Sequence, residues 1–455
     1  MKKKTALKDA IAKNVAWLKT MHQPGGYAGP VIHYWQDCLN YTGPSMNWCY
    51  EGLIDAFLRL HKKTKNDKFL ALAQQAGDDL LKNQLSNGIF LNSHFEANPS
   101  LGRGSTPHDT AAALGLAYLA RYLREKGTKY LLAAKKNLDN YHFNFLYDKK
   151  TGIFRQYHYD KQNLHVPNKI ATLIELLLMI YDLTKEQKYY EVVIANAEYI
   201  LQHQDTTTMA GGIYQTEKHK HIISIYTARC IPALLKVYAI TKDKKYLRAA
   251  QQAGVFLKKM RNAKGGYDFG YLKTEKGWKR FKYPIFIAGS ADITRALFLL
   301  GEKKIVERDI QWLIRHQLPT GGFMTSYGMN LKNKDQTYIG KPCWRDILPV
   351  VGWNDKVLRL LSELLPSKVT ILEEEGKFPC EIKCADGTYN ESVEAMYVQS
   401  KKKYVFDKRK QFSAYNDFYA ALMRKAIPFV GTRTDRFLDI KVIDYLLKRG
   451  LTTKK

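Results

Sequence analysis

The chain is 455 residues long and strongly basic, with 72 Lys and Arg residues against 43 Asp and Glu residues and a formal net charge of +29. Hydrophobic residues at 45% and charged residues at 25% are ordinary values for a globular protein, and they exclude a largely disordered chain. No run of about 18 apolar residues is present, so the sequence predicts no membrane span, although its charge is compatible with peripheral contact with an anionic membrane.

The first residues of the chain do not form a typical secretion signal. Met1 to Lys4 are basic, but the amphipathic segment that follows lacks the uninterrupted apolar stretch and the cleavage site of a signal peptide. The six cysteines are too few for a disulfide scaffold, which fits a reducing compartment. The sequence therefore predicts a cytoplasmic protein.

The positive charge is spread over the predicted helices and their connections. The lysines contain no nucleic-acid recognition motif among them, so we expect no nucleic acid partner. An anionic glycan, an anionic membrane face or a generally lysine-rich proteome would each account for the charge.

A glycine followed by a large apolar residue ends an apolar helical segment six times along the chain. The six glycines recur every 54 to 64 residues, which leaves room for two helices and their connections in each unit, and they are Gly26, Gly88, Gly152, Gly212, Gly266 and Gly322. Six helix pairs of this kind can close into a ring.

The first helix of each unit has an apolar stripe on one side and small residues at helical spacing. Its start repeats a pattern, with Asp67-Lys68-Phe69 in one unit and Lys-Tyr pairs at 129–130, 188–189 and 245–246 in others. The second helix is apolar around most of its circumference, so we expect it to be buried on both sides; these segments are 46–60, 110–122, 170–183, 223–240, 293–300 and 347–361. The pattern predicts an inner ring of helices inside an outer ring.

The connections alternate between short and long. Residues 62–67, 184–187 and 241–244 form short polar connections, whereas the connections after each glycine are long and rich in aromatic residues. Long loops on one rim of a rigid scaffold are where binding and catalytic residues concentrate. We therefore expect the functional face at the long-connection rim.

The repeat stops near residue 365, which predicts two parts, a domain of residues 1–366 and an appendage of residues 367–455. Short β-type runs at 369–372, 380–383 and 404–406 precede two helical patterns at 412–426 and 435–448, so we expect a small α+β unit. Cys380 and Cys384 are not spaced as a zinc-binding pair, and we expect no metal site.

The helix sequences NDKFLALAQQAGDDLLKNQ and KDKKYLRAAQQAGVFLKKM, followed by GGY and GGF, resemble the six-hairpin toroids of carbohydrate-active enzymes. The resemblance covers residues 5–365 and implies an all-α (α/α)6 toroid. The superfamily includes unsaturated glucuronyl hydrolases, several glycoside hydrolase families, sugar epimerases and some polysaccharide lyases. The resemblance therefore implies an enzyme that acts on a glycan.

A second resemblance is to terpene cyclases. The segments IQWLIRHQLPTGGF and AEYILQHQDTTTMAGGIY are similar to their glutamine-to-aromatic repeats, and PHDTAAALGL is similar to part of their acidic motif. Only Asp109 of that acidic cluster is present, because Pro107 and His108 stand where further acidic residues would be expected.

Three aspartates, Asp109, Asp292 and Asp346, recur at a similar phase near the starts of inner helices. Ring closure would bring them to one opening, and glycoside hydrolysis needs one protonated and one ionised carboxyl group. We expect Asp109 and Asp292 to form the catalytic pair, with Asp346 third. The alternative for each is a helix cap or a first-turn carboxylate.

Aromatic, histidine and arginine side chains on the same rim are candidates for substrate binding. Aromatic rings stack on sugar faces, and arginines pair with carboxylate or sulfate groups, so convergent arginines would favour an acidic sugar. The alternative for the aromatic residues is packing within the loops. The candidates are His33, Trp35, Trp48, His108, His158, Tyr226, Arg229, Arg295, Trp344 and Arg345.

The sequence thus predicts a cofactor-independent glycan hydrolase that acts on an oligosaccharide or polysaccharide, with anionic carbohydrate as its partner and polysaccharide biosynthesis as its role. A uronate lyase or epimerase is an alternative, for which His33, His158, Lys169 and Tyr226 are available as acids and bases. A terpene-cyclase-like or prenyl-binding toroid and a non-catalytic glycan-binding scaffold are further alternatives.

Overall fold

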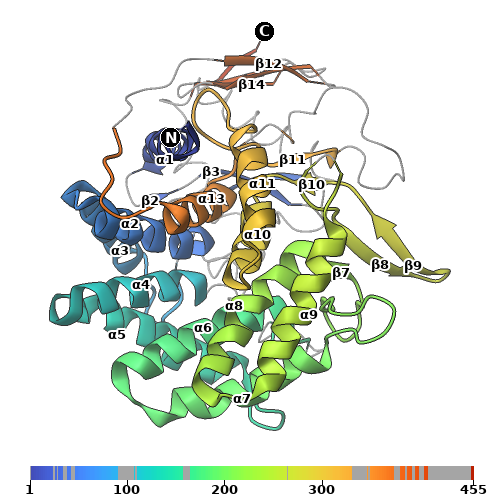
Figure 1. The fold of residues 1–455 in the computed structure, drawn as a ribbon. Helices are drawn as coiled ribbons and strands as arrows, with labels where there is room; N and C mark the ends of the chain where they lie inside the picture. The colour runs from blue at the N-terminus through green and yellow to red at the C-terminus, as the bar shows by residue number, and fades with distance from the viewer. Residues whose placement is uncertain are drawn as a thin grey trace.

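The computed structural model describes residues 2–23, 26–27, 29–33, 38–42, 47–90, 107, 110–156, 164–263, 265–329, 346 and 349–372, and strands between 380 and 454. Side chains are described for these residues except 2–4, 23, 29–33, 38–42, 47 and the strands after 380. The described part is mostly helical (Figure 1).

Six of the described helices form an inner ring. They are α2 (Tyr50–Thr64), α4 (Thr110–Leu123), α6 (Pro167–Thr184), α8 (Ser224–Thr241), α10 (Ser290–Leu299) and α13 (Val351–Leu364). Each helix packs against the next in this order, and α13 packs against α2, so the ring closes. The colours in Figure 1 follow this order around the ring. The predicted inner helices are confirmed.

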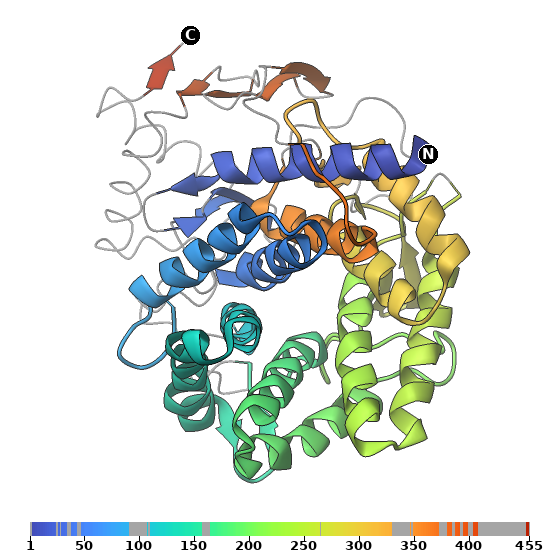
Figure 2. The same ribbon diagram turned by 60° about the vertical axis from the view of Figure 1, so that its left-hand side comes forward.

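The outer ring consists of α1 (Lys2–Thr20), α3 (Asp67–Lys82), α5 (Thr128–Lys136), α7 (Gln187–Gln202), α9 (Lys244–Met260) and α11 (Lys303–Ile314). A 3-10 turn, η4 (Arg124–Gly127), precedes α5, and a π-helix, η5 (Asn137–Leu146), continues it. Helix α1 packs against α13 and α11, so α1 and α13 form the sixth hairpin of the ring (Figure 2). The fold is the predicted all-α (α/α)6 toroid.

The repeated Lys-Tyr pairs join neighbouring outer helices. The hydroxyl groups of Tyr130, Tyr189 and Tyr246 donate to carboxylates of the preceding outer element, which are Asp78, Asp139 and Glu198. The lysine before each tyrosine pairs with the same carboxylate, at 2.6, 3.0 and 2.8 Å. The pattern seen in the sequence therefore marks one contact that recurs around the outside of the ring.

The glycines turn the chain back from each outer helix towards the centre. In each unit an antiparallel residue pair closes the turn: His22 with Tyr27, Gln84 with Phe90, Tyr147 with Phe154, Gln204 with Ile213, Arg261 with Tyr267 and Gln317 with Phe323. Gly88 has φ +93°, and a Cβ atom there would lie 2.3 Å from the carbonyl oxygen of Lys136. Only glycine fits this approach of two backbones.

The short connections at the opposite rim are as brief as predicted. Lys65, Lys185 and Lys242 each end an inner helix in the left-handed region, at φ 60°. The N–H of each donates to the carbonyl four residues earlier, and the next outer helix begins two residues later in every case.

Short strands lie in the long connections. They are β1 (His22–Gln23), β2 (Gly26–Tyr27), β3 (Gly29–His33), β4 (Cys38–Thr42), β5 (Tyr147–Asp148), β6 (Ile153–Phe154), β7 (Ile222–Ile223), β8 (Gly270–Thr274), β9 (Gly277–Phe281), β10 (Ile285–Phe286) and β11 (Ser326–Tyr327). They form two-stranded pairs except for the three-stranded sheet β7-β8-β9. A 3-10 turn, η1 (Asn47–Cys49), leads into α2.

After α13 the chain forms a five-stranded antiparallel sheet in the order β12-β13-β14-β15-β16. Its strands are β12 (Cys380–Cys384), β13 (Gly387–Glu391), β14 (Ala395–Val398), β15 (Tyr404–Asp407) and β16 (Thr452–Lys454). The predicted β runs at 380–383 and 404–406 are confirmed, and the predicted helices at 412–426 and 435–448 lie outside the described residues. The boundary at residue 366 stays a prediction.

Two expected boundaries near the end of the ring are wrong. Residues 369–372 form no strand, because they follow α13 directly and the N–H groups of Lys368 and Val369 bond to the carbonyl of Lys63. Helix α13 begins at Val351, because residues 349 and 350 before it are not helical, and residues 347 and 348 of the expected helix lie outside the described residues.

Candidate functional site

The inner helices begin at the long-connection rim, and their first turns carry charged side chains that meet inside the ring. Glu51 is the second residue of α2, Asp292 is the third of α10, and Arg229 is the sixth of α8. Arg359 reaches the same place from the middle of α13. We call these four residues the central ion cluster.

The carboxylate of Glu51 lies between two guanidinium groups. Arg229 Nη1 donates to Glu51 Oε1 over 2.9 Å and Arg229 Nη2 donates to Oε2. Arg359 Nη1 donates to Glu51 Oε1, and Arg359 Nη2 donates to Asp292 Oδ1 over 2.8 Å. Arg229 Nε also donates to Thr172 on α6 over 3.1 Å. The cluster therefore ties together five of the six inner helices.

Asp292 is the member of the cluster that solvent reaches most easily. The side chain of Asp292 is 9% exposed, compared with 6% for Arg229, 2% for Arg359 and 1% for Glu51. Burial is the largest influence on the pKa of Glu51 and would raise it, but the charges of Arg229 and Arg359 outweigh burial and hold that pKa well below its usual range. The cluster is thus a set of connected ion pairs shielded from water.

Two further ionic groups lie deeper in the ring. Lys236 Nζ binds Glu175 Oε2 over 2.7 Å, and Glu363 pairs with both Arg295 and Arg59, at 2.7 and 3.3 Å. Burial opposes ionisation of Glu175 most strongly, but Lys236 and Arg229 lower its pKa overall. The interior of the inner ring is therefore charged along much of its length and internally paired.

Asp355, on α13, differs from Glu51 and Glu175 in the direction of its pKa shift. Lys356 Nζ contacts Asp355 Oδ2 over 2.6 Å, whereas Asp355 Oδ1 has no hydrogen-bond partner among the described residues. Burial is the main cause that raises the pKa of Asp355 to about 7, although Lys356 lowers it. Burial therefore favours the protonated form of Asp355.

An aromatic cluster lies where α10 and α13 begin. The ring centroids of Trp48 and Trp353 are 5.6 Å apart, and those of Trp353 and Phe286 are 5.8 Å apart. A Cβ atom added to Gly289, which directly precedes α10, would contact both Phe286 and Trp353. Trp353 and Phe286 are half-buried, so apolar ring surface lies beside the helix that carries Asp292.

The predicted catalytic residues are only partly described. Asp292 does not cap its helix, because the N-cap is Gly289 and the carboxylate binds Arg359. The buried carboxylate Oδ1 of Asp346 accepts hydrogen bonds from Ser326 Oγ and the N–H of Met329, at 2.8 and 2.9 Å, and so holds the loop that follows β11. Asp109 lies outside the described residues.

The predicted binding residues are similarly divided. Arg229 and Arg295 both bind carboxylates of the chain itself, so neither guanidinium is presented alone to a ligand. Trp48 belongs to the aromatic cluster, and Tyr226 is half-buried in the first turn of α8. The side chain of His33 is not described. The other candidates lie outside the described residues, and they are Trp35, His108, His158, Trp344 and Arg345.

Sequence reasoning missed Arg359, Asp355 and Glu175. Glu175 is a charged residue inside the apolar run LIELLLMI, whereas Asp355 and Arg359 lie on a helix that carries several charged residues. A charge that an apolar helix must bury needs a partner, and this signal would have identified Glu175.

The described part of the chain holds no group of three His, Cys, Asp or Glu side chains placed to bind a metal ion. Among the described helices, none combines the length and apolar character needed to cross a membrane.

Comparison with known proteins finds similarity in structure alone. No family model matches the chain, and no curated protein matches its sequence. A heparin-specific unsaturated glucuronyl hydrolase matches with a TM-score of 0.59 and 14% identity, covering 80% of this chain and 99% of that one.

Two other solved structures match over a similar length. A glycoside hydrolase family 76 mannosidase of Bacteroides thetaiotaomicron has a TM-score of 0.55 at 16% identity, covering 79% of this chain and 98% of its own. A cellobiose 2-epimerase of Bacillus thermoamylovorans has a TM-score of 0.58 at 14% identity, covering 78% and 99%. At these identities the shared property is the six-hairpin toroid fold.

Proposed function

We propose that the chain is a carbohydrate-active enzyme that hydrolyses a glycan at the long-connection rim of the toroid. The observation that carries the proposal is the carboxylate of Asp292, which lies in the first turn of α10 and is fixed by Arg359, on a helix whose preceding residue, Gly289, lies against the aromatic cluster. A carboxylate of fixed orientation next to apolar ring surface suits a sugar, because sugars stack on aromatic rings while carboxyl groups perform the chemistry.

The catalytic partner in this proposal is Asp109, which directly precedes α4 in the chain. Helices α4 and α10 lie opposite each other in the inner ring, with two inner helices between them on either side. A glycosidic bond held between two such helices would have one carboxyl group on each side. One donates a proton to the leaving oxygen while the other activates water or attacks the sugar carbon.

The charged interior supports this proposal over two of the alternatives. A terpene cyclase or prenyl-binding toroid would need an apolar pit, whereas Arg229 and Arg359 converge inside this ring. A scaffold without catalytic function would leave Asp292 free to serve as a helix cap, and Asp292 binds Arg359 instead. The matching structures named above all bear names of carbohydrate-active enzymes.

A sugar epimerase is the second candidate, because one of the matching structures is a cellobiose 2-epimerase. The two candidates differ in their products. Hydrolysis shortens a glycan and creates a new reducing end, whereas epimerisation leaves its length and mass unchanged.

The test is a screen of the purified protein against unsaturated uronyl disaccharides, α-mannan and cellobiose, read by mass spectrometry and by release of reducing ends. For the substrate that is converted, we expect Asp292→Asn and Asp109→Asn each to lower turnover at least about a hundredfold. Full turnover in either variant would remove that residue from the mechanism. A protein that neither binds nor converts any carbohydrate would contradict the proposal.

Asp309→Asn is the matched control for Asp292→Asn. Asp309, on the outer helix α11, is also a buried carboxylate and accepts hydrogen bonds from Arg261 Nε, at 3.0 Å, and from Tyr267. Both substitutions weaken a buried ion pair, so we expect both to lower the melting temperature. Only Asp292→Asn should abolish turnover, and an equal loss in both variants would show that the effect is structural.

A further inference from the structure

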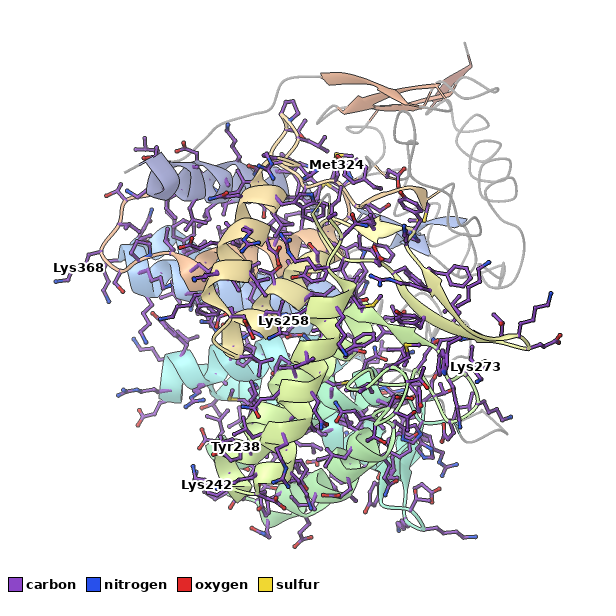
Figure 3. All side chains as sticks on the ribbon, turned by 45° about the vertical axis from the view of Figure 1, so that its right-hand side comes forward. Tyr238, Lys242, Lys258, Lys273, Met324 and Lys368 are labelled. Carbon is purple, nitrogen blue, oxygen red and sulfur yellow. The ribbon has the colours of Figure 1, made fainter. Side chains whose placement is uncertain are left out.

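A β-hairpin of β8 and β9 projects from the toroid beside the loop that precedes α8. Figures 1 and 3 show this hairpin standing clear of the helices, and Figure 3 labels Lys273. Strand β8 pairs with β7 on one side and with β9 on the other, so β9 is the free edge of the sheet. The hairpin turn consists of Glu275 and Lys276, and Gly277 follows them at φ +106°.

Lysines dominate the hairpin and the neighbouring loop. Six exposed lysines lie on the two segments 214–222 and 270–282, and they are Lys218, Lys220, Lys273, Lys276, Lys279 and Lys282. These segments contain two acidic residues. Glu217 contacts His165 over 3.1 Å, and Glu275 lies in the hairpin turn. Arg280 is paired with Asp268 over 2.9 Å. We call the six lysines, with Tyr214 and Trp278, the basic ledge.

Two of these lysine side chains lie against aromatic rings. The rings of Tyr214 and Trp278 stack with centroids 6.0 Å apart and planes 9° apart, which ties the loop to the hairpin. Lys220 Nζ lies 5.9 Å from the centroid of Tyr214, and Lys273 Nζ lies 5.3 Å from that of Trp278. Cation–π contacts restrict two long side chains, so a ligand that binds them loses less conformational entropy.

The basic ledge is continuous with the rim that carries the proposed catalytic site. Strand β7 leads directly into α8, whose Arg229 belongs to the central ion cluster. Strand β9 leads through β10 into α10, which carries Asp292. A polymer bound at the opening of the ring can therefore extend over the ledge without leaving this rim.

The sequence of the hairpin turn argues against insertion into a membrane. Residues 274–277 are Thr, Glu, Lys and Gly, and the large aromatic side chain, Trp278, packs against Tyr214 on the flank of the hairpin. Membrane-anchoring loops need exposed apolar side chains at their tips. The ledge instead suits a water-soluble chain that carries repeated negative charges.

We propose that the basic ledge is a binding surface for an anionic polysaccharide. Such a polysaccharide bears carboxylate or sulfate groups along its length. This inference rests on the proposed function in one respect, that the ligand is a glycan. Binding at the ledge itself requires no turnover. Ammonium groups spaced along two segments would contact several sugar units outside the catalytic opening. Long anionic glycans should therefore bind more tightly than short or neutral ones.

The test compares two triple variants with equal losses of charge. The ledge variant is Lys273→Gln, Lys276→Gln and Lys279→Gln. The control variant is Lys62→Gln, Lys126→Gln and Lys244→Gln, which removes three exposed lysines at the short-connection rim. Binding of fluorescently labelled polygalacturonate, heparin and dextran is measured by anisotropy at low and physiological salt, after thermal unfolding has confirmed that both variants are folded.

We expect the ledge variant to lose at least about tenfold in affinity for the two anionic polymers, and the control variant to lose about twofold or less. The affinity of a galacturonate trisaccharide and of neutral dextran should not change. Equal losses in the two variants would show a general effect of net charge and would overturn the proposal. So would tighter binding of duplex DNA, or of phosphatidylserine vesicles, than of the anionic glycans.

Binding and turnover, measured on the same preparations, separate this inference from the proposed function. If the screen finds no turnover but the ledge variant binds less tightly than the control variant, the proposed function fails and the ledge proposal stands. If turnover is found and the two triple variants bind equally, the ledge proposal fails alone.

Discussion

The inner and outer rings use ion pairs in opposite ways. In the inner ring, Glu51, Arg229, Arg359 and Asp292 form one connected cluster that is almost fully removed from water. In the outer ring, pairs such as Lys188 with Asp139 and Lys245 with Glu198 join neighbouring elements, and both partners of these pairs remain partly exposed.

Because of this difference, the exposed and the buried ion pairs should contribute differently to the stability of the protein. Exposed pairs contribute roughly 0 to 1 kcal/mol each, because water solvates the charges almost as well as the partner does. Removing one partner of a buried pair costs several kcal/mol, because the other charge is left unsolvated. The outer pairs thus add many small contributions, whereas the inner cluster stabilises the ring only if all its members are present.

The largest effect should come from Arg359→Met, which keeps the aliphatic part of the side chain and removes both contacts to Glu51 and Asp292. We expect a loss of about 3 to 5 kcal/mol in the free energy of unfolding, measured by urea denaturation. Lys245→Met is the control in the outer ring and should lose much less, because water solvates the carboxylate of Glu198 once the lysine is gone. Similar losses in the two variants would abolish the distinction between the rings.

A smaller effect should follow from pH. Because the folded protein raises the pKa of Asp355 to about 7, from 3.8, it holds a proton that the unfolded chain releases between these values. Asp355 therefore contributes a stability that falls as pH rises from about 4 to about 7, by about 2 kcal/mol between pH 5 and 7. Lys356, Arg359 and Asp292 are the charges that act on it.

The matched variant is Asp355→Asn, which resembles the protonated acid at every pH. Urea denaturation across this pH range should show a shallower decline in the variant than in the unsubstituted protein. Parallel declines would mean that Asp355 does not titrate there.

The smallest effect should come from Tyr189→Phe in the outer ring. The hydroxyl group of Tyr189 lies 2.9 Å from both oxygens of Asp139, and its loss should cost about 1 kcal/mol in chemical denaturation. Phe69 occupies the equivalent position in an earlier unit and is buried without a hydroxyl group. A loss of unfolding free energy as large as that of Arg359→Met would show that the Lys-Tyr contacts stabilise the protein as strongly as the central ion cluster does.

The fold could be predicted because its determinants are local and repeated. Gly88 and Gly152 adopt positive φ at the turns where the spacing placed them, and α6 is apolar around most of its surface, as an inner helix must be. Pro349 is a local feature of the same kind, and it stands two residues before the observed start of α13.

The central ion cluster could not be derived in this way, because its contacts join distant parts of the chain. Glu51 lies 178 positions from Arg229 and 308 positions from Arg359. Which charged residues meet at the axis depends on the rotation of each helix and on where it begins. Asp292 was recognised because it lies in the first turn of a helix, whereas Arg359 reaches the cluster from the middle of one.

The pairing of α1 with α13 also has a consequence for synthesis. Ile11 and Leu18 of α1 are fully buried in the finished ring, and the helix against which α1 packs ends at Leu364. The ribosome therefore makes α1 hundreds of residues before its partner, so the nascent chain exposes an unpaired apolar surface while the intervening helices are synthesised. A chaperone that shields this helix until the sixth hairpin emerges would raise the yield of folded protein.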